Sequence, residues 1–274
     1  MKLATLFTGG KDSTYAMYLA QKQGHEITCL ITIQSENPDS YMFHTPAIEV
    51  TELQAESMNM PHILGSTEGE KEKELVDLKE LIIAAKSKFE FEGVITGALF
   101  SEYQSSRIQT ICDSLNLKCI NPLWHKKQED EMQELLDKKF DIIFTSIAAE
   151  GLDKSWLNRI ITQDDLETLK GKVMVNVAGE GGEFESLVVD CPLFEKKIVI
   201  EEFEKSITDG SVFVFYNRAR NRVKCLFWNK NGFVLYQKRL ERGKFKISDS
   251  KGAPFIITQQ QLDWLLAGLD FTLM

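Results

Sequence analysis

The residues with the clearest chemical meaning lie near the N-terminus, where an apolar run ends at "TGGKDS" (8–13). Two adjacent glycines allow a tight turn that presents backbone N–H groups. A helix is expected to begin near Asp12–Ser13, and the unpaired N–H groups at a helix start carry partial positive charge. The segment therefore predicts an anion site, with phosphate as the usual ligand. The alternative is a plain strand-to-helix turn in which Asp12 or Ser13 caps the helix.

Two common phosphate-binding motifs do not fit this segment. A Walker loop needs glycine where Thr5 stands and serine or threonine where Asp12 stands. The dinucleotide-binding pattern G-x-G-x-x-G is also missing from the sequence. The loop must therefore be of another kind.

A second chemical segment is "GEGGEFES" (179–186), where Glu180, Glu183 and Glu185 surround a Gly-Gly pair that includes Gly182. Three carboxylates so close together are costly to bury without partners. They predict a pocket that positions ammonia or ammonium, a cationic substrate group, or a metal. The alternative is an acidic surface turn.

Two further segments predict substrate contacts. "SENPDSYMFH" (35–44) has neither helical nor strand periodicity, which is typical of a substrate-facing loop. Its candidate residues are Ser35, Glu36, Asn37, Tyr41 and His44. His44 has an alternative role as a structural histidine. In "SEYQSSR" (101–107) the candidates are Tyr103, Gln104 and Arg107, and the first and last of them share a helix face. Arg107 would bind an anionic ligand group or form a surface ion pair.

The elements that must position these residues alternate between short apolar runs and longer helical stretches. The apolar runs fall at 3–8, 26–33, 61–66, 93–100, 118–123 and 140–149. Because most of these runs show no alternation, they favour strands covered on both faces, in an α/β fold with a parallel sheet of about five strands. Ligands bind beyond the carboxyl ends of such strands, where "TGGKDS" lies.

Composition agrees with a folded protein that carries a distinct C-terminal segment. The chain has 274 residues, 43% hydrophobic and 27% charged, and a net charge of −9. No apolar run approaches the roughly 20 residues of a membrane span, so we expect a cytoplasmic protein. Five scattered cysteines predict buried, reduced thiols. Residues 211–274 hold 11 Lys/Arg and 4 Asp/Glu, whereas residues 1–210 hold 21 Lys/Arg and 37 Asp/Glu. The C-terminal segment is therefore basic and the rest of the chain is acidic.

Several motifs together identify a family. "TGGKDS" resembles the S-G-G-x-D-S signature of PP-loop ATP pyrophosphatases, which share an adenine nucleotide alpha hydrolase-like fold, with Thr8 in place of serine. "TELQAESMNMP", "GALFSEYQSSRI", "GLDKSWLNR" and "AGEGGEFESLVVDCPLF" add a resemblance to diphthine–ammonia ligases, in order and spacing, over residues 1–207. Such enzymes adenylate the carboxylate of diphthine, a modified histidine of elongation factor 2, and ammonia then displaces AMP.

This resemblance implies ATP and Mg²⁺ as cofactors, and roles for particular residues. The phosphate-binding residues are Thr8, Gly9, Gly10, Lys11, Asp12 and Ser13. Lys11 and Asp12 act in catalysis and Asp12 also binds the metal, although Lys11 has the alternative of a solvated surface lysine. Ile33, Gly97 and Ala98 flank adenine, or else pack in the core. Glu183 is the catalytic member of the acidic segment, whose ligand is ammonia, the cationic part of diphthine, or a metal.

The implied domain organisation has three parts. They are a PP-loop ATP-binding domain at 1–138, a smaller α+β substrate-binding region at 139–209, and a short β-rich basic tail at 210–274. The tail's "NGFVLYQKRLERGKF" and "QQLDWLLAGLDF" resemble a TnpB-type accessory protein of bacterial insertion sequences. We expect a hairpin around 231–232 and a helix at 258–267. The run 211–218 is expected to replace the C-terminal strand that the family has in its sheet.

Three functions follow from these resemblances. The first is a diphthine–ammonia ligase. The second is a ligase of the same chemistry acting on another carboxylate in a bacterium, and the third is a nucleotide-binding remnant without turnover. Because the basic residues of the tail form no dense run in the sequence, we expect the tail to pack against the acidic part or into a homodimer, rather than to bind nucleic acid.

Overall fold

The computed structural model describes residues 1–37, 50–200, 211–217, 219–230, 232–247 and 257–269. The chain forms two compact units, 1–200 and 201–274, and each is described by itself. Among the helices of these described residues, none is long and apolar enough to cross a membrane. All five cysteines are free, and Cys119 is the one that is not fully buried.

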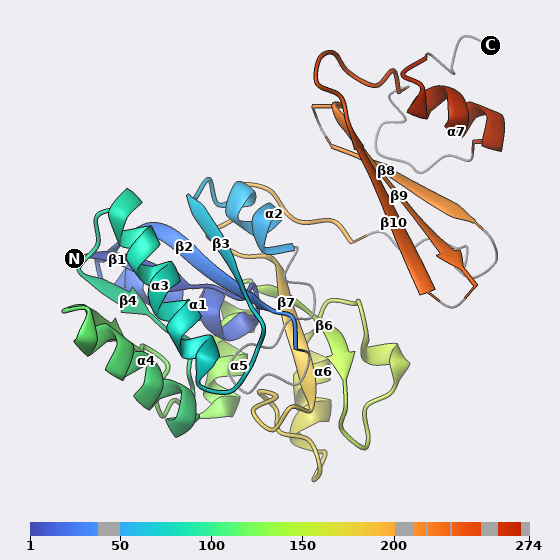
Figure 1. Cartoon of the computed structure of the whole chain (residues 1–274). Helices are drawn as coiled ribbons and strands as arrows, with labels where there is room; N and C mark the ends of the chain where they lie inside the picture. The colour runs from blue at the N-terminus through green and yellow to red at the C-terminus, as the bar shows by residue number, and fades with distance from the viewer. Residues whose placement is uncertain (38–49, 201–210, 218, 231, 248–256, 270–274) are drawn as a thin grey trace. The chain divides into compact units, whose positions relative to one another are not determined.

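The first unit is built on a five-stranded parallel sheet of order β3-β2-β1-β4-β5 (Figure 1). The strands are β1 (Lys2–Leu6), β2 (Glu26–Ser35), β3 (His62–Thr67), β4 (Gly93–Ile95) and β5 (Lys118–Ile120). The helices are α1 (Lys11–Lys22), α2 (Val50–Ser57), α3 (Lys73–Lys88), α4 (Glu102–Ser114) and α5 (Gln128–Asp137). The predicted α/β fold with a parallel sheet is therefore confirmed.

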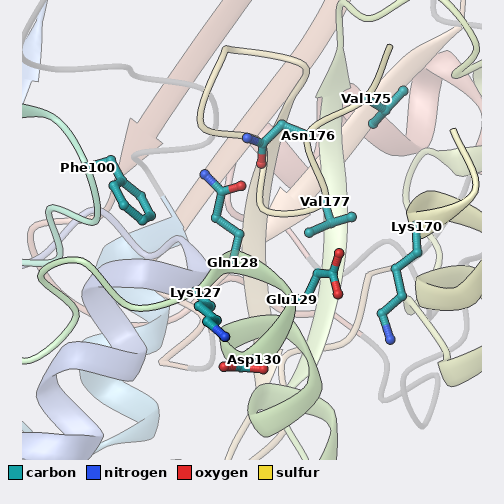
Figure 2. Close-up of a pocket in the computed structure, with 9 residues that line it drawn as sticks. All are labelled: Phe100, Lys127, Gln128, Glu129, Asp130, Lys170, Val175, Asn176 and Val177. Atoms are coloured by element: carbon teal, nitrogen blue, oxygen red, sulfur yellow. The ribbon is translucent and has the colours of Figure 1, made fainter. Parts of the chain in front are cut away.

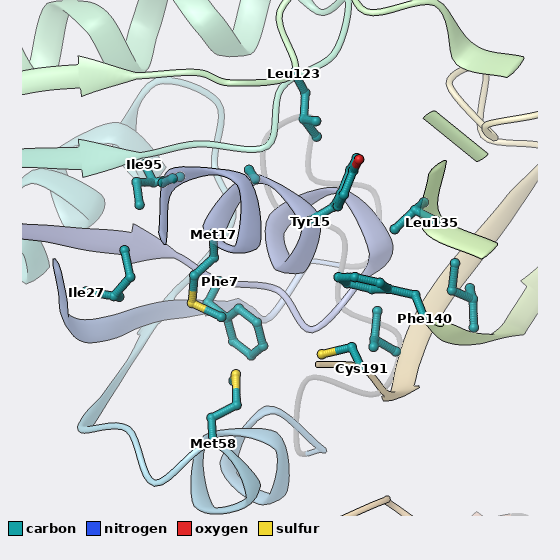
Figure 3. Packing of buried hydrophobic residues seen from close by; sticks show 14 of the residues in the cluster. Phe7, Tyr15, Met17, Ile27, Met58, Ile95, Leu123, Leu135, Phe140 and Cys191 are labelled. Atoms are coloured by element: carbon teal, nitrogen blue, oxygen red, sulfur yellow. The ribbon is translucent and has the colours of Figure 1, made fainter. Parts of the chain in front are cut away.

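Helices cover both faces of this sheet. Apolar side chains of α1, α2 and α5 pack with Leu3, Phe7 and Leu30 on one face, as Figure 3 shows for part of this cluster. Side chains of α3 and α4 pack with Ala4, Ile31 and their neighbours on the other. Since both faces are covered, the strands have no polar alternation. The strand order changes direction at β1, because β2 and β3 are added on one side of it and β4 and β5 on the other. Parallel sheets of this kind bind ligands at such a switch point.

The run at 140–149 differs from the prediction. It forms β6 (Asp141–Ile147), which pairs antiparallel with β7 (Phe184–Asp190) in a separate two-stranded sheet instead of joining the parallel one. The run is still apolar because both faces of β6 are buried, with Phe144 stacked on Phe184 on one face and Ile143 packed against Leu187 on the other. Between these strands lie a short 3₁₀ turn (Lys154–Trp156) and α6 (Gln163–Lys170).

The second unit is an antiparallel sheet of order β10-β9-β8 with one helix. Its elements are β8 (Val212–Tyr216), β9 (Arg222–Asn229), β10 (Gly232–Arg239) and α7 (Gln259–Leu266). The predicted hairpin and helix are confirmed. The expectation that 211–218 joins the main sheet is wrong, because β8 pairs with β9 along its whole length, for example Val214 with Cys225.

Candidate active site

The predicted phosphate loop connects β1 to α1. Gly9 has φ +80°, a left-handed conformation that favours glycine. The loop closes on itself, because Ser13 Oγ lies 3.1 Å from Thr8 Oγ1 and accepts a hydrogen bond from the Thr8 N–H at 3.2 Å. Helix α1 begins at Lys11, slightly before the predicted start, and its N-cap is Gly10, which has no side chain to cap the helix. The N-cap residue itself thus gives no partner to the first N–H groups of α1, an arrangement suited to binding an anion.

Gly97 packs directly against the start of α1. A Cβ at Gly97 would lie 2.7 Å from the Asp12 carbonyl carbon and 2.7 Å from the Ser13 nitrogen. Ala98 is buried, and Ile33 is a core residue of the cluster beneath α3 and α4. These positions are those of packing residues, so their contact with adenine stays a prediction.

Two residues that the sequence analysis did not select join the loop to β7. Gln54 of α2 is fully buried, and its Nε2 donates to Gly9 O and to Val188 O, both at 2.8 Å. The Lys11 N–H donates to Ser186 Oγ at 3.2 Å. Gln54 and Ser186 lie inside two of the segments that resemble the family, "TELQ" and "GEFES". Their positions in the sequence do not show that they contact the phosphate loop.

Replacing Gln54 by leucine removes both hydrogen bonds while nearly preserving side-chain volume. Both carbonyls then lose a donor, although Gly9 O still accepts from the Val188 N–H at 3.0 Å. Because a lost buried hydrogen bond costs about 1–3 kcal/mol, we expect ATP to bind about ten-fold more weakly, as measured by titration calorimetry. The matched control is Gln109→Leu on α4, whose exposed side chain bonds only to Asp113 in the described structure. Equal ATP affinity in the two variants would contradict a role for Gln54 in shaping the loop.

Lys11 is buried, not solvated. Its side chain is 1% exposed, pairs with Asp12, and places Nζ 3.7 Å from Glu131 Oε2. Burial by itself would lower the pKa of Lys11, but the Asp12 and Glu131 carboxylates outweigh it and raise the pKa. Glu131 of α5 is itself fully buried, and this burial raises its pKa, although the Lys11 charge opposes the effect. Glu131 was not predicted from the sequence as a site residue. It lies in an acidic run, which is typical of the exposed first turn of a helix.

The structure divides the three glutamates of the acidic segment. Glu180 is exposed at the surface, yet partial desolvation raises its pKa, the Asp12 carboxylate adds to the effect, and Lys11 and the Phe100 N–H oppose it. The Glu183 carboxylate instead accepts hydrogen bonds from the Asn176 and Gly181 N–H groups, at 3.3 and 2.8 Å, and braces its own turn. Glu185 lies in β7 opposite Ser146.

Gly182 is an exposed turn residue with φ +81°. A pocket of about 620 Å³ lies between the start of α5 and residues 175–177, which precede the acidic segment in the chain (Figure 2). It is lined by Phe100, by residues 127–130 at the start of α5, by Lys170 and by residues 175–177. Phe100 donates its backbone N–H to Glu180, and Asn176 donates its own to Glu183. Two residues of the pocket lining are therefore linked to the acidic segment.

The other predicted substrate residues lie in two places. Arg107 forms an ion pair with Glu72 at 2.7 Å and stacks over the Tyr103 ring, 3.5 Å from its centroid. The ion-pair alternative for Arg107 is therefore the one observed. Gln104 follows on the same helix, and its N–H is capped by Ser101 Oγ.

The start of the predicted substrate loop is anchored to the end of β3. Ser35 Oγ accepts from the Asn37 N–H at 3.1 Å, and the Asn37 side chain donates to Gly69 O at 3.1 Å. The Glu36 N–H donates to Thr67 O. Tyr41 and His44 lie outside the described residues. The sequence had no signal for this anchoring, because Gly69 is remote along the chain.

Known proteins match the chain in two parts. Residues 1–119 match the family described as diphthamide synthase N-terminal domain, and residues 127–221 match its C-terminal domain. Diphthine–ammonia ligase of Rattus norvegicus is 36% identical over 237 residues, which cover 78% of this chain and 88% of the relative. The Homo sapiens enzyme of the same name is 35% identical with the same coverage. The chain belongs to the diphthine–ammonia ligase family.

The C-terminal unit of this ligase has a different relationship. Residues 196–274 match the family described as IS66 Orf2 like protein. The uncharacterized protein y4hO of Sinorhizobium fredii is 36% identical over 63 residues, which cover 23% of this chain and 55% of that protein. Both predicted resemblances are therefore confirmed: the enzyme is a ligase of the diphthine–ammonia ligase family with an insertion-sequence-related segment at its end.

Proposed function

We propose that the enzyme uses ATP to adenylate a carboxylate and transfers the acyl group to ammonia, with release of AMP and pyrophosphate. The carboxylate is diphthine of elongation factor 2, as the names of the relatives suggest. The observation that carries this proposal is the hydrogen bond from the Lys11 N–H to Ser186 Oγ, which joins the acidic segment to the phosphate loop. A site for anionic phosphates and a site for a cationic or amine group then adjoin.

Thr8–Ser13 would hold the phosphates of ATP, with backbone N–H groups at the start of α1 as donors. Asp12 is suited to Mg²⁺, because its side chain is about one-third exposed and Mg²⁺ is usually bound by one or two carboxylates together with phosphate oxygens. Within the described residues no group of three or more His, Cys, Asp or Glu side chains could hold a metal alone. The metal would neutralise charge on the phosphates.

The reaction needs two steps because a carboxylate has a poor leaving group. In the first, a carboxylate oxygen attacks the α-phosphorus, and the bond from that phosphorus to the bridging oxygen breaks to release pyrophosphate. In the second, the ammonia nitrogen attacks the acyl carbon, the bond to AMP breaks, and the nitrogen loses a proton. We assign Glu180 to hold ammonia or ammonium and to accept this proton. Glu183 would act by holding the turn that carries Glu180.

This division predicts different results for two substitutions. Glu180→Gln removes the charge beside the loop, and should lower amide formation about ten-fold or more, as expected for a charge-assisted contact of about 1.5–3 kcal/mol. ATP affinity should hold or rise, because a negative charge near the phosphates is lost. Glu183→Gln keeps one acceptor for the turn, and should lower amide formation less than Glu180→Gln does.

The measurements are titration calorimetry with ATP and mass spectrometry of diphthine-bearing elongation factor 2 after incubation with ATP and ammonium. Glu150→Gln, an exposed glutamate near the same region, is the matched control. Parallel losses of ATP binding and amide formation in Glu180→Gln would refute the assignment. Pyrophosphate release without conversion of diphthine would point to another carboxylate, and would refute diphthine as the substrate.

A further inference from the structure

Basic side chains gather at one end of the C-terminal sheet. Arg222 begins β9 and pairs with Arg239, which ends β10. The turn that leads into β9 and the segment that follows β10 both lie at this end of the sheet, where β9 begins and β10 ends. The basic residues brought there are Arg220, Arg222, Arg239, Arg242, Lys244 and Lys246, which we call the basic end. They make up six of the eleven Lys/Arg residues in 211–274.

Backbone contacts hold this segment in place. The Phe245 N–H donates to Arg220 O, and the Leu240 N–H donates to Asn221 O. Phe245 and Ile247 are buried in the core of this unit, 1% and 5% exposed. Because neighbouring side chains of an extended segment point in opposite directions, Lys244 and Lys246 are turned to solvent, and both are exposed.

Five of the six cations of the basic end have no ion-pair partner among the described residues. Arg222, Arg239, Arg242, Lys244 and Lys246 are exposed, and none of them forms an ion pair with another described residue. Neighbouring strands lie about 4.8 Å apart, so these cations repel one another at close range. A polyanion with regularly spaced charges would relieve this repulsion.

Aromatic side chains lie at the same end. Phe215 of β8 is 39% exposed and pairs with Lys224, so its ring shares a face of the sheet with Lys224 and Arg222. Tyr216 pairs with the buried Val223 and lies on the opposite, core-facing side. Exposed aromatic rings beside cations are typical of surfaces on which unpaired bases stack while the backbone phosphates contact Lys and Arg.

We infer that the basic end binds single-stranded DNA, through phosphate contacts and base stacking on Phe215. The inference does not depend on the ligase reaction, because every residue that carries it lies in the second unit. The sequence analysis expected no nucleic-acid binding, since the basic residues are scattered along the chain. The antiparallel pairing of β9 with β10 is what brings them together.

The test uses the full chain and a fluorescein-labelled oligothymidylate of about 20 nucleotides, with binding followed by fluorescence anisotropy. We expect binding at low salt that weakens as salt rises, with a slope of about −0.7 for each phosphate contact. The triple variant Arg222→Ala, Arg239→Ala, Lys244→Ala should bind at least about ten-fold more weakly and reduce that slope by about 2. Phe215→Ser should weaken binding about ten-fold and leave the slope unchanged.

Two controls separate this site from general charge attraction. Replacing Lys86, Lys88 and Lys118 of the first unit by alanine removes the same charge elsewhere and should leave binding unchanged. Lys230→Ala removes one cation at the opposite end of the hairpin and should also have little effect. Circular dichroism shows whether each variant is folded. Equal losses in the control triple variant, tighter binding of duplex than of single strand, or equal affinity for polyglutamate would each overturn the inference.

Discussion

Asp12→Ala is expected to abolish ATP-dependent pyrophosphate release, with a fall of about a hundred-fold or more. The Asp12 carboxylate lies at the start of α1, pairs with Lys11 and neighbours Glu180. Its loss removes the proposed metal ligand, and leaves the buried Lys11 with Glu131 as its remaining described ion-pair partner. Electrostatic groups of this kind typically contribute 10²–10³ in rate. Pyrophosphate release by a coupled assay, together with calorimetric titration of ATP with Mg²⁺, measures the effect.

The control for Asp12→Ala is Asp113→Ala, an exposed aspartate on α4. It should keep full activity. Asp12→Asn tests charge at constant shape, and should resemble Asp12→Ala if the carboxylate binds the metal. Undiminished pyrophosphate release in Asp12→Ala would refute the assignment of this loop to ATP.

Gly97→Ala is expected to cause the second large loss, although it adds only one methyl group. The new Cβ would lie 2.7 Å from backbone atoms of Asp12 and Ser13, and backbone cannot move aside as a flexible side chain can. Either the start of α1 or the end of β4 must shift, at a cost of about 1–3 kcal/mol. We expect ATP binding to weaken by at least ten-fold and the melting temperature to fall by several degrees.

Gly171→Ala is the matched control for Gly97→Ala. A Cβ at Gly171 would meet only ordinary contacts, 3.5 Å from Thr168 O and 3.8 Å from Glu167 O. Its backbone is in the right-handed helical region, so alanine fits without strain. Thermal unfolding and ATP titration of both variants separate a local clash from a general effect of added volume. Wild-type ATP affinity in Gly97→Ala would show that the phosphates do not depend on this contact.

The sequence alone determined the parts of the protein that depend on neighbours along the chain. Apolar runs and helical spacing predicted the strands and helices of the parallel sheet, because burial of a strand or of a helix face leaves a periodic pattern. The phosphate loop was found for the same reason, since the glycines and the helix start that follows them are contiguous. The acidic segment and the change of charge near residue 210 were likewise visible in the sequence.

Only the tertiary structure decided which distant residues meet. It brought Gln54 to Gly9 and Val188, and Ser186 to Lys11. It also showed that Glu183 is held within its own turn by the Asn176 and Gly181 N–H groups, which three similar glutamates in six positions cannot show. Hydrogen bonds between segments far apart in the chain depend on how their elements pack.

The same reason explains where the sequence misled. An apolar run indicates that a strand is buried, but it does not indicate which strand pairs with it. For this reason β6 and β8 were both wrongly predicted to join the parallel sheet. Basic residues that are scattered along the sequence also do not indicate that the β9–β10 hairpin brings them together. Burial is a local property that composition and periodicity preserve, whereas strand pairing and side-chain contacts are fixed by the packing of the whole unit.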